Sequence, residues 1–485
     1  MNSNYDAVII GAGAVGCAIA RELSRYDFQI AVLEKEEDVA AGTSGRNSAV
    51  VHAGFNNKPG SLMAKLCVEG NQEFEQICKI LDVPYKKTGK LLIAFDDKDM
   101  DSLRGIIEIG ERNGCQGLRL VSQAELQKLA PHVSGVGGMF SPETAIFNPF
   151  IYCIAMAENA AKNGVKFFLG HEVTKISSID EGFQVFTGSK MFTTRYIINS
   201  AGLYSDRISE MAGISGYKIY PCRGEYYILD KIANDYLDIP VYPVPKAGIG
   251  GLGVHLTPTI DGNIILGPSA EYIEERDDYS CTVETMDKLF QEARQLLPAL
   301  ERRHIIGNYS GIRPKQAPRE EGGFRDFIIK EEPEQPGLIN LIGIESPGMT
   351  ASVPIARMVR DIIAKSANLR EKRNYDPQRK GILRFRDQIP EVQSSLIADD
   401  PEYGEVICRC QKITKRELRE AINNLLGGKS ISAIKYRTWA TTGRCNGGYC
   451  LSKIVDMMVR EYGMDPAEIT YRGKGSELFI GEAKG

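Results

Sequence analysis

The chain has 485 residues, a length that predicts two or three folding units rather than one core. Its composition, 43% hydrophobic and 25% charged with a net charge of −4, is typical of a soluble globular protein and argues against nucleic acid or an anionic membrane as a partner. The early apolar run at 7–20 is too short for a membrane span and follows an acidic residue. We therefore expect no transmembrane segment and a cytoplasmic location, with membrane association only through a partner.

The first 36 residues predict a βαβ unit. Residues 7–13 have the pattern of a short buried strand that ends in glycines, 14–26 have helical spacing, and 28–36 form a second strand. Further helices are predicted at 60–82, 97–113, 122–129 and 149–163. A strand pair at 165–179 and 182–187 follows, and 196–208 returns to strand, glycine turn and helix.

Between 215 and 330 the pattern changes to strands, with one helix near 283–297. This change predicts a β-rich substrate lobe, made mainly of 80–145 and 215–330. Residues 337–366 come back to strand, Gly/Pro loop and helix and close the first unit. The expected organisation is an α/β unit over 1–366 with the interleaved lobe, a charged, proline-containing linker at 367–404, and a small helical unit over 405–485.

A nucleotide-binding motif lies at the first turn. Gly11, Gly13 and Gly16 form GxGxxG between strand and helix, where backbone N–H groups and the helix N-terminus can approach a pyrophosphate. Glu34 ends the second strand, where an acidic side chain can bind a ribose, with Lys35 beside it. The alternative is that the glycines only pack helix on strand.

Three further segments identify the dinucleotide by resemblance. "GTSGRNSAVVHAGF", "NSAGLYSDR" and "GIESPGMTASVPIA" resemble the FAD-dependent oxidoreductases of the D-amino-acid-oxidase and glycerol-3-phosphate-dehydrogenase superfamily, over about residues 4–365. The resemblance implies a Rossmann-like FAD-binding fold and the adenine placed against the backbone of Val173. The other residues implied to hold FAD are Thr43, Ser44, Asn47, Ser48, Ala201, Gly202, Gly343, Gly348, Met349 and Thr350.

Four of the eleven cysteines gather near the C-terminus: Cys408, Cys410, Cys445 and Cys450. The other seven are scattered and are expected to be small core residues. Four thiolates can hold zinc or an iron–sulfur cluster, and four unligated thiols are the third possibility. The spacing resembles the [2Fe-2S] domain of bacterioferritin-associated ferredoxins. Cys450 is also expected to begin a helix, whose N-terminus favours a thiolate.

The catalytic candidates are His52, His255, Arg313 and Ser346. His52 lies in the stretch that resembles a flavin-lining segment, and His255 lies in "GLGVHLTPT". A histidine near neutral pKa can take the hydroxyl proton of a secondary alcohol as hydride leaves its carbon. The resemblance makes Arg313 the clamp for an anionic substrate, and Ser346 a hydrogen-bond partner of that substrate. For each of them, a purely structural role is the alternative.

The resemblance implies a small anionic 2-hydroxy substrate, and glycerol 3-phosphate is the leading expectation. Electrons would pass from FAD through the [2Fe-2S] cluster to an electron carrier or a second flavoprotein subunit. L-2-hydroxyglutarate dehydrogenase is the main alternative. An amine or hydroxyproline dehydrogenase subunit, or an electron-transfer protein without a substrate of its own, are the others.

Overall fold

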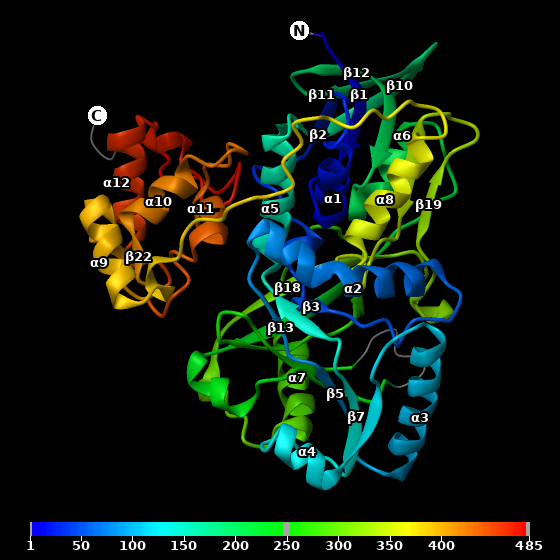
Figure 1. The fold of residues 1–485 in the computed structure, drawn as a ribbon, viewed down its shortest axis with the longest axis vertical. Coiled ribbons are helices and arrows are strands. Elements are labelled where there is room, and N and C mark those ends of the chain that lie inside the picture. Colours follow the sequence, from blue (N-terminus) through cyan, green and yellow to red (C-terminus); the bar gives the residue numbers. More distant parts are fainter. Residues whose placement is uncertain (1, 246–252, 482–485) are drawn as a thin grey trace.

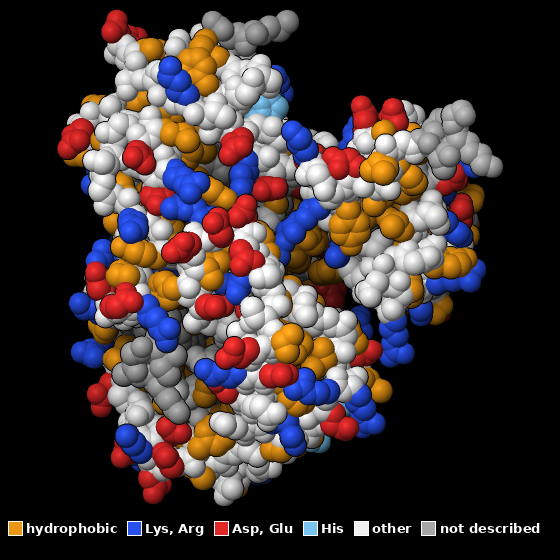
Figure 2. Space-filling view, turned by 180° about the vertical axis from the view of Figure 1, so that it is seen from behind, with side chains coloured by type: hydrophobic (Ala, Val, Ile, Leu, Met, Phe, Trp, Pro, Cys, Tyr) orange, Lys and Arg blue, Asp and Glu red, His pale blue; other side chains and the backbone are white. Residues whose placement is uncertain are grey.

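The computed structural model describes residues 2–245 and 253–481. Two large sheets with their helices form one elongated body, and a smaller helical unit lies at its side (Figure 1). We refer to residues 405–481 as the C-terminal unit. Seen from behind, this unit projects beside the main body, and basic and acidic side chains are interspersed over the surface (Figure 2).

The first large sheet is a mostly parallel nucleotide-binding sheet. Its central order is β10–β11–β12–β1–β2–β9, with β20 beside β12 and β19 beside β20. Strand β1 is parallel to both β2 and β12. Its strands are β1 Asn2–Ile10, β2 Ile30–Leu33, β9 Lys166–Phe168, β10 Val173–Ile179, β11 Gly182–Thr187, β12 Met191–Asn199, β19 Ile328–Glu331 and β20 Leu338–Ile342.

The second large sheet forms the other lobe. Its order is β17–β13–β16–β15–β14–β5–β7–β6, with β18 beside β13. Its strands are β5 Lys90–Ala94, β6 Arg119–Ser122, β7 Gly137–Ser141, β13 Tyr220–Leu229, β14 Val241–Pro243, β15 His255–Pro258, β16 Ile264–Gly267, β17 Glu271–Tyr272 and β18 Ile305–Lys315. Two small sheets complete the described strands: β3 Val50–Val51 with β4 Tyr85–Lys87 and β8 Ala145–Phe147, and β21 Val406–Cys408 with β22 Ile413–Thr414.

The helices lie close to their predicted positions. They are α1 Ala14–Leu23, α2 Leu62–Leu81, α3 Asp97–Arg112, α4 Gln123–Leu129, α5 Pro149–Lys162, α6 Ser205–Met211, α7 Val283–Leu296, α8 Ser352–Ile363, α9 Pro390–Asp399, α10 Lys415–Ile422, α11 Ile431–Thr438 and α12 Leu451–Tyr462. The helices predicted in the first βαβ unit and in both lobes, and the helix expected to begin at Cys450, are thus confirmed, whereas α9 and α11 were not predicted. None of the described helices combines the length and apolarity needed to cross a bilayer.

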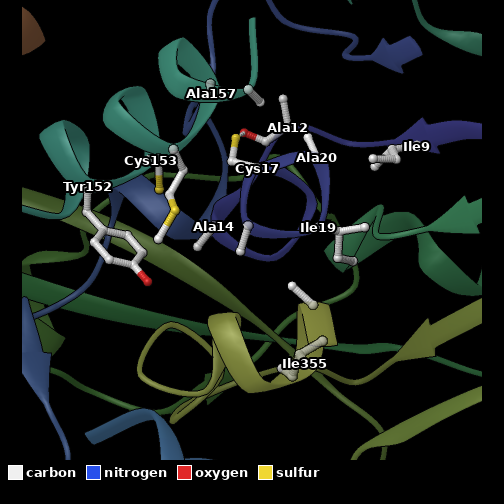
Figure 3. Close-up of a cluster of buried hydrophobic side chains, with 14 of the residues drawn as sticks. Ile9, Ala12, Ala14, Cys17, Ile19, Ala20, Tyr152, Cys153, Ala157 and Ile355 are labelled. Carbon is white, nitrogen blue, oxygen red and sulfur yellow. Dashed lines mark hydrogen bonds between the residues drawn. The ribbon is translucent and has the colours of Figure 1, made fainter. Parts of the chain in front are cut away.

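Small side chains allow helix α1 to pack closely between α5 and α8. Cys17 and Ala20 face α5, which contributes Cys153 and Ala157, and Ile355 of α8 covers another side (Figure 3). A Cβ on Gly16 would lie 2.0 Å from the carbonyl oxygen of Gly11, so only glycine allows this approach of helix and loop. Close packing therefore holds the α1 N-terminus at the edge of the sheet.

Residues 367–404, predicted to be a linker, lie against the main body. The side-chain amide of Asn159 on α5 donates to the carbonyl oxygens of Asp376 and Gln378 at 3.0 and 3.1 Å. Arg379 forms an ion pair with Glu158 at 2.7 Å. The segment then forms α9 beside the C-terminal unit (Figure 1). These contacts pair polar groups along the segment, so it follows a defined path.

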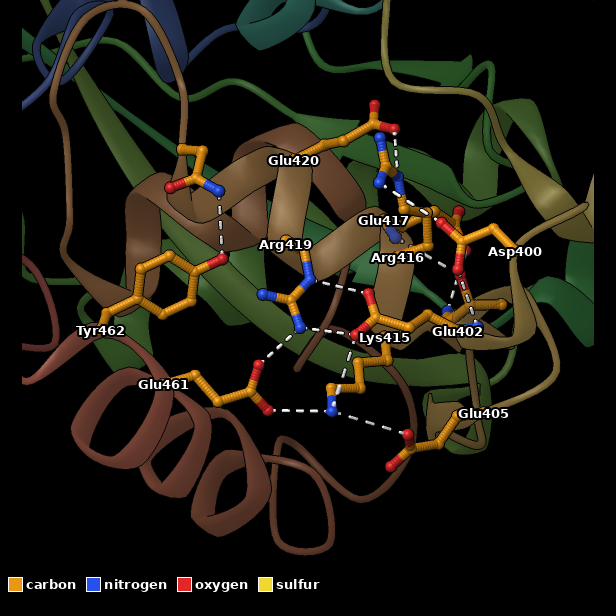
Figure 4. A network of polar contacts seen from close by, with 12 residues as sticks. Asp400, Glu402, Glu405, Lys415, Arg416, Glu417, Arg419, Glu420, Glu461 and Tyr462 are labelled. Carbon is orange, nitrogen blue, oxygen red and sulfur yellow. Dashed lines mark hydrogen bonds and ion pairs between the residues drawn. The ribbon is translucent and has the colours of Figure 1, made fainter.

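Charged side chains connect three elements of the C-terminal region: α10, α12 and the short turn Pro401–Tyr403 (Figure 4). Arg419 pairs with both Glu402 and Glu461, and Lys415 lies 2.9 Å from Glu461. Thr414 and Glu417 form the capping box that starts α10. The network adds to a separate apolar core of this unit, which includes Leu418, Ile434 and Ile454.

Candidate active site and cluster-binding unit

A long cavity of about 1070 Å³ runs between the two lobes. One end is formed by the turns that follow β1 and β2. The other end is formed by side chains of β5, β14, β15 and β18. Its walls therefore come from both large sheets, which is the usual place for a cofactor and its substrate.

The nucleotide end has the geometry of a dinucleotide site. Gly11 has a positive φ of 100°, and a Cβ on it would lie 2.7 Å from the carbonyl oxygen of Ser200. The Glu34 carboxylate accepts hydrogen bonds from the backbone N–H of Ala12 at 2.7 Å and of Glu36 at 3.0 Å. Burial raises the pKa of Glu34. Glycines leave room at the α1 N-terminus, where Oγ of Ser44 accepts a hydrogen bond from the backbone N–H of Ala14 at 2.9 Å. Together with an acceptor at the end of β2, this arrangement fits FAD.

The predicted cofactor residues lie along this cavity with two exceptions. The residues that line it are Gly11, Gly13, Glu34, Lys35, Thr43, Ser44, Asn47, Ser48, Val173, Ala201, Gly202, Gly348, Met349 and Thr350. Gly16 and Gly343 do not line it and contact protein instead. A Cβ on Gly343 would lie 2.1 Å from the side-chain amide of Gln316. Both glycines therefore allow close packing of the protein behind the cavity wall and do not contact the cavity themselves.

His52 and Ser346 meet at the far end of the cavity. The Nε2 atom of His52 lies 3.2 Å from Oγ of Ser346, and the backbone N–H of His52 donates to Oγ1 of Thr350 at 3.1 Å. Burial, with smaller effects of Lys90 and His255, lowers the pKa of His52 to about 3. The imidazole is therefore neutral at pH 7. Its pKa is not near neutrality as expected from the sequence, because burial disfavours the charged ring.

His255 lies on the face of a tyrosine. Its ring stacks on Tyr242 with centroids 3.7 Å apart, and Nδ1 lies 3.0 Å from the carbonyl oxygen of Gly253. Nε2 is buried without a hydrogen-bond partner among the described residues. Burial, with the charges of Lys90 and Arg313, lowers the pKa of His255 to about 3. The geometry gives His255 one unpaired ring nitrogen in the cavity.

Arg313 is the free guanidinium of this end. It donates to the carbonyl oxygen of Ser269, and no described acidic side chain forms an ion pair with it. Lys315, two residues later on β18, is neutralised by Glu345 at 2.8 Å. From the sequence, Lys246 and Lys315 could each add positive charge to the site, but Lys246 lies outside the described residues.

Sequence reasoning missed Lys90 and Tyr242. Lys90 begins β5, and its side chain lines the same cavity as His52 and His255. A lysine at the start of the apolar run "KLLIA" was the signal that could have identified it, because a charged side chain is costly inside a buried strand. Tyr242 had no comparable signal, because its role depends on stacking against a residue from another strand.

The four C-terminal cysteines form two pairs. Cys410 and Cys445 have their sulfur atoms 3.5 Å apart. Burial and the neighbouring Cys408 thiol raise the pKa of Cys450, which precedes α12 as predicted. Among the described residues, no three ligand side chains are arranged around a single metal ion. A [2Fe-2S] cluster instead takes two ligands on each of two irons, so the paired thiols fit this cluster better than zinc.

The other cysteines agree with the prediction of small core residues. Cys17, Cys67, Cys78, Cys115, Cys153 and Cys222 are buried and Cys281 is partly buried, all as free thiols. None of these seven is needed for the paired arrangement of the last four.

One phenylalanine connects the cavity wall with the C-terminal unit. Phe150, on α5, stacks on Tyr436 of α11 with ring centroids 4.0 Å apart and meets Trp439 edge to face at 6.0 Å. On its other side, a Cβ on Gly45 would lie 2.8 Å from the Phe150 ring. Gly45 ends the Thr43–Gly45 turn of the cavity wall. The turn and the C-terminal unit therefore share one aromatic contact.

The first large sheet has the glycine turn of a dinucleotide site, and the cavity between the lobes ends in a histidine–serine pair. Together these two features define a dinucleotide-dependent oxidoreductase. The chain belongs to the FAD dependent oxidoreductase family, whose family model matches residues 6–362. A second model, the BFD-like [2Fe-2S] binding domain, matches residues 406–460. These matches confirm the predicted fold class and both predicted cofactors, FAD and a [2Fe-2S] cluster.

Relatives of known name resemble the whole chain or its larger part. The glycerol 3-phosphate dehydrogenase of Caloramator mitchellensis is 37% identical over 99% of both chains. The mitochondrial L-2-hydroxyglutarate dehydrogenase of Homo sapiens is 30% identical and covers 76% of this chain and 90% of its own. Among solved structures, FAD-bound L-alpha-glycerophosphate oxidase from Mycoplasma pneumoniae has a TM-score of 0.72 at 28% identity, over 78% of this chain and 98% of its own.

Proposed function

We propose that the protein oxidises sn-glycerol 3-phosphate to dihydroxyacetone phosphate with FAD as the first electron acceptor. The observation that carries this proposal is that the His52–Ser346 pair and the Arg313 guanidinium line the same cavity, which begins at the dinucleotide turn. The dehydrogenase of this name that matches 99% of the chain supports the same substrate.

Arg313 binds the anionic group of the substrate in this proposal. A guanidinium presents a planar fork of donors that suits phosphate, and the Arg313 side chain has only a carbonyl partner, Ser269, within the described protein. Binding the anion there fixes one end of the substrate and leaves its hydroxyl to be placed by the other groups.

His52 accepts the proton of the substrate hydroxyl. Its imidazole is neutral, and Ser346, 3.2 Å from Nε2, orients the ring and the hydroxyl. FAD, when bound, accepts the hydride that leaves carbon 2 of the substrate. Loss of one hydride and one proton converts the secondary alcohol to the ketone. His255, with its unpaired Nε2, is the second candidate partner of the substrate oxygen.

The C-terminal unit carries the electrons away in this proposal. Cys408, Cys410, Cys445 and Cys450 would hold a [2Fe-2S] cluster, which accepts one electron at a time. The sulfur atoms of Cys410 and Cys445 belong to exposed residues, so a cluster there is accessible to an external acceptor. We propose an electron carrier or a second flavoprotein subunit as that acceptor.

L-2-hydroxyglutarate is the second candidate substrate. The enzymes of this name match the flavin-binding part of the chain, and a dicarboxylate would find separate cations in Arg313 and Lys90. Anaerobic mixing of the holoprotein with each compound separates the two proposals. We expect glycerol 3-phosphate to bleach the flavin absorbance faster. Bleaching by the dicarboxylate alone would replace the first proposal by the second.

A further inference from the structure

Among the described residues, Lys90 is a buried lysine without an anionic partner. It is 1% exposed and begins β5, which lies between β14 and β7 inside the second large sheet. Its Nζ atom lies over two aromatic rings, 4.6 Å from the centroid of Phe55 and 4.4 Å from that of Tyr242. In residues 2–245 and 253–481, no hydrogen bond or ion pair from Nζ is formed.

Lys315 shows how this protein otherwise buries a lysine. It is also 1% exposed and lines the same cavity, but its ammonium group contacts the Glu345 carboxylate and the carbonyl oxygen of Gly323, both at 2.8 Å. Removing an ammonium from water is costly unless an opposite charge or acceptors replace the water. The rings beside Lys90 compensate only part of this cost. The missing partner of Lys90 is therefore expected to be a ligand of the cavity.

The charges at this end of the cavity favour a ligand with two negative charges. The Lys315–Glu345 pair is neutral, and both His52 and His255 are uncharged at pH 7. Among the described residues, Arg313 and Lys90 remain as two basic groups of this end without an acidic partner, and both lower the pKa of His255. Burial lowers the pKa of Lys90 to about 7, so Lys90 carries its full charge only when an anion binds beside it. A phosphate monoester or a dicarboxylate carries the matching charge, whereas a monocarboxylate does not.

An unpaired polar atom near Lys90 also points to a ligand. Within the described chain, Nε2 of His255 is buried without a hydrogen-bond partner, and His255 lines the cavity. Buried polar groups are normally paired, so this unpaired ring nitrogen indicates a polar molecule in the cavity that supplies its partner.

We propose that Lys90 is a second anion-binding residue of the substrate site, which together with Arg313 selects dianionic ligands over monoanionic ones. The proposal deepens the proposed function and rests on it for the place of the substrate. It does not depend on whether the dianion is a phosphate ester or a dicarboxylate.

The test measures binding of three non-oxidisable probes to the FAD-loaded protein by their effect on the flavin spectrum. The probes are the dianions glycerol 2-phosphate and glutarate and the monoanion butyrate. Lys90→Met approximately keeps the length of the side chain. We expect it to lower the affinity for the tighter-binding dianion about 30-fold or more and the affinity for butyrate less than threefold. The control Lys65→Met, at an exposed site on α2, is expected to change neither affinity. Equal effects on dianion and monoanion, or none, would overturn the proposal.

A second measurement uses the unaltered protein, in case Lys90→Met does not fold. Burial lowers the pKa of Lys90 to about 7, so Lys90 is mostly neutral at pH 8 in the free protein. Binding of a dianion should therefore make Lys90 take up a proton from the solvent. The titratable groups that face it stay uncharged there: burial raises the pKa of Cys67, Cys115 and Tyr242, and both histidines are neutral. Calorimetry in two buffers of different ionisation enthalpy should show proton uptake with the dianion and none with butyrate. Equal uptake with both probes contradicts the proposal.

These outcomes are separable from those of the proposed function. If glycerol 3-phosphate does not reduce the flavin but dianion selectivity depends on Lys90, the proposed substrate is rejected and the inference about Lys90 stands. If glycerol 3-phosphate reduces the flavin rapidly but Lys90→Met does not change dianion binding, the proposed substrate stands and the inference about Lys90 is rejected.

Discussion

Arg437 of the C-terminal unit and Asp38 of the nucleotide-binding unit form a buried ion pair across the interface of the two. The two residues are 399 positions apart in the chain, and a guanidinium nitrogen lies 3.0 Å from a carboxylate oxygen. The Arg437 side chain is 1% exposed and that of Asp38 is 9% exposed. An arginine that lies near the cysteines in sequence therefore joins the two units.

This pair predicts that the C-terminal unit detaches when Asp38 is changed. Asp38→Ala leaves the buried Arg437 charge with only the longer contact to Glu158 at 3.8 Å, and removing one partner of a buried pair typically costs about 3–5 kcal/mol. Hydrogen exchange of α11 and limited proteolysis within 367–404 should both increase, while the flavin spectrum stays in place. Arg444→Met is the matched control, because Arg444 is 79% exposed and its pair with Asp230 is 3.4 Å long. Unchanged exchange in Asp38→Ala would show that the pair does not hold the interface.

Cys410→Ser tests the cluster assignment. Removing one of the two exposed thiols should abolish the EPR signal of the reduced cluster, which requires about two irons per chain. The flavin is expected to remain, because the cofactor cavity contains no residue of the C-terminal unit among its lining. Cys281→Ser, a change of a thiol far from the four in sequence, serves as the control. Stoichiometric zinc without iron in the unaltered protein would contradict the prediction.

Arg313→Ala should raise the KM for glycerol 3-phosphate. Truncating one partner of a charged, hydrogen-bonded pair costs about 2–5 kcal/mol, and the anion has no other partner with a planar fork at this position. Steady-state kinetics with an artificial dye as acceptor measure the effect. Lys288→Ala, at an exposed site on α7, controls for a general loss of cationic charge. A KM within twofold of the original value would remove Arg313 from the substrate clamp.

His52→Ala is expected to act mainly on kcat. Loss of a general base reduces the rate about 10²- to 10⁴-fold, whereas anion binding at Arg313 is retained. The rate of flavin bleaching in single-turnover mixing reports the chemical step directly. His171→Ala is the comparison, because this partly buried histidine lines the nucleotide end of the cavity rather than the His52–Ser346 end. If His255→Ala showed the larger loss of rate, His255 would be the base.

The affinity for glycerol 3-phosphate should fall as pH rises above about 7. Burial lowers the pKa of Lys90 to about 7, so the free protein loses this charge above that pH and binding must restore it. Between pH 7.5 and 9 the phosphate remains a dianion, and the loss should approach tenfold per pH unit. Lys90→Arg keeps its charge throughout this range and should give a flatter profile. Parallel profiles for the two proteins would mean that another group titrates.

The sequence by itself determined the features whose chemistry depends on neighbours along the chain. Gly11, Gly13 and Glu34 belong to one βαβ unit, and the spacing of that unit alone places them around a nucleotide. The positions of the helices predicted at 60–82, 97–113 and 149–163 followed from apolar periodicity. Cys408 and Cys410 stand out because two thiols one residue apart are unusual among scattered cysteines.

Only the tertiary structure decided which distant residues meet. Lys90 is unpaired because of what β14 and the loop after β3 place beside it, and Arg437 is buried because Asp38 lies opposite to it. His255 acquires its free Nε2 from stacking on Tyr242, a residue of a different strand. The physical reason is that burial and the lack of a partner are properties of the packed chain. A charged side chain looks the same in sequence whether water, a carboxylate or a ligand satisfies it.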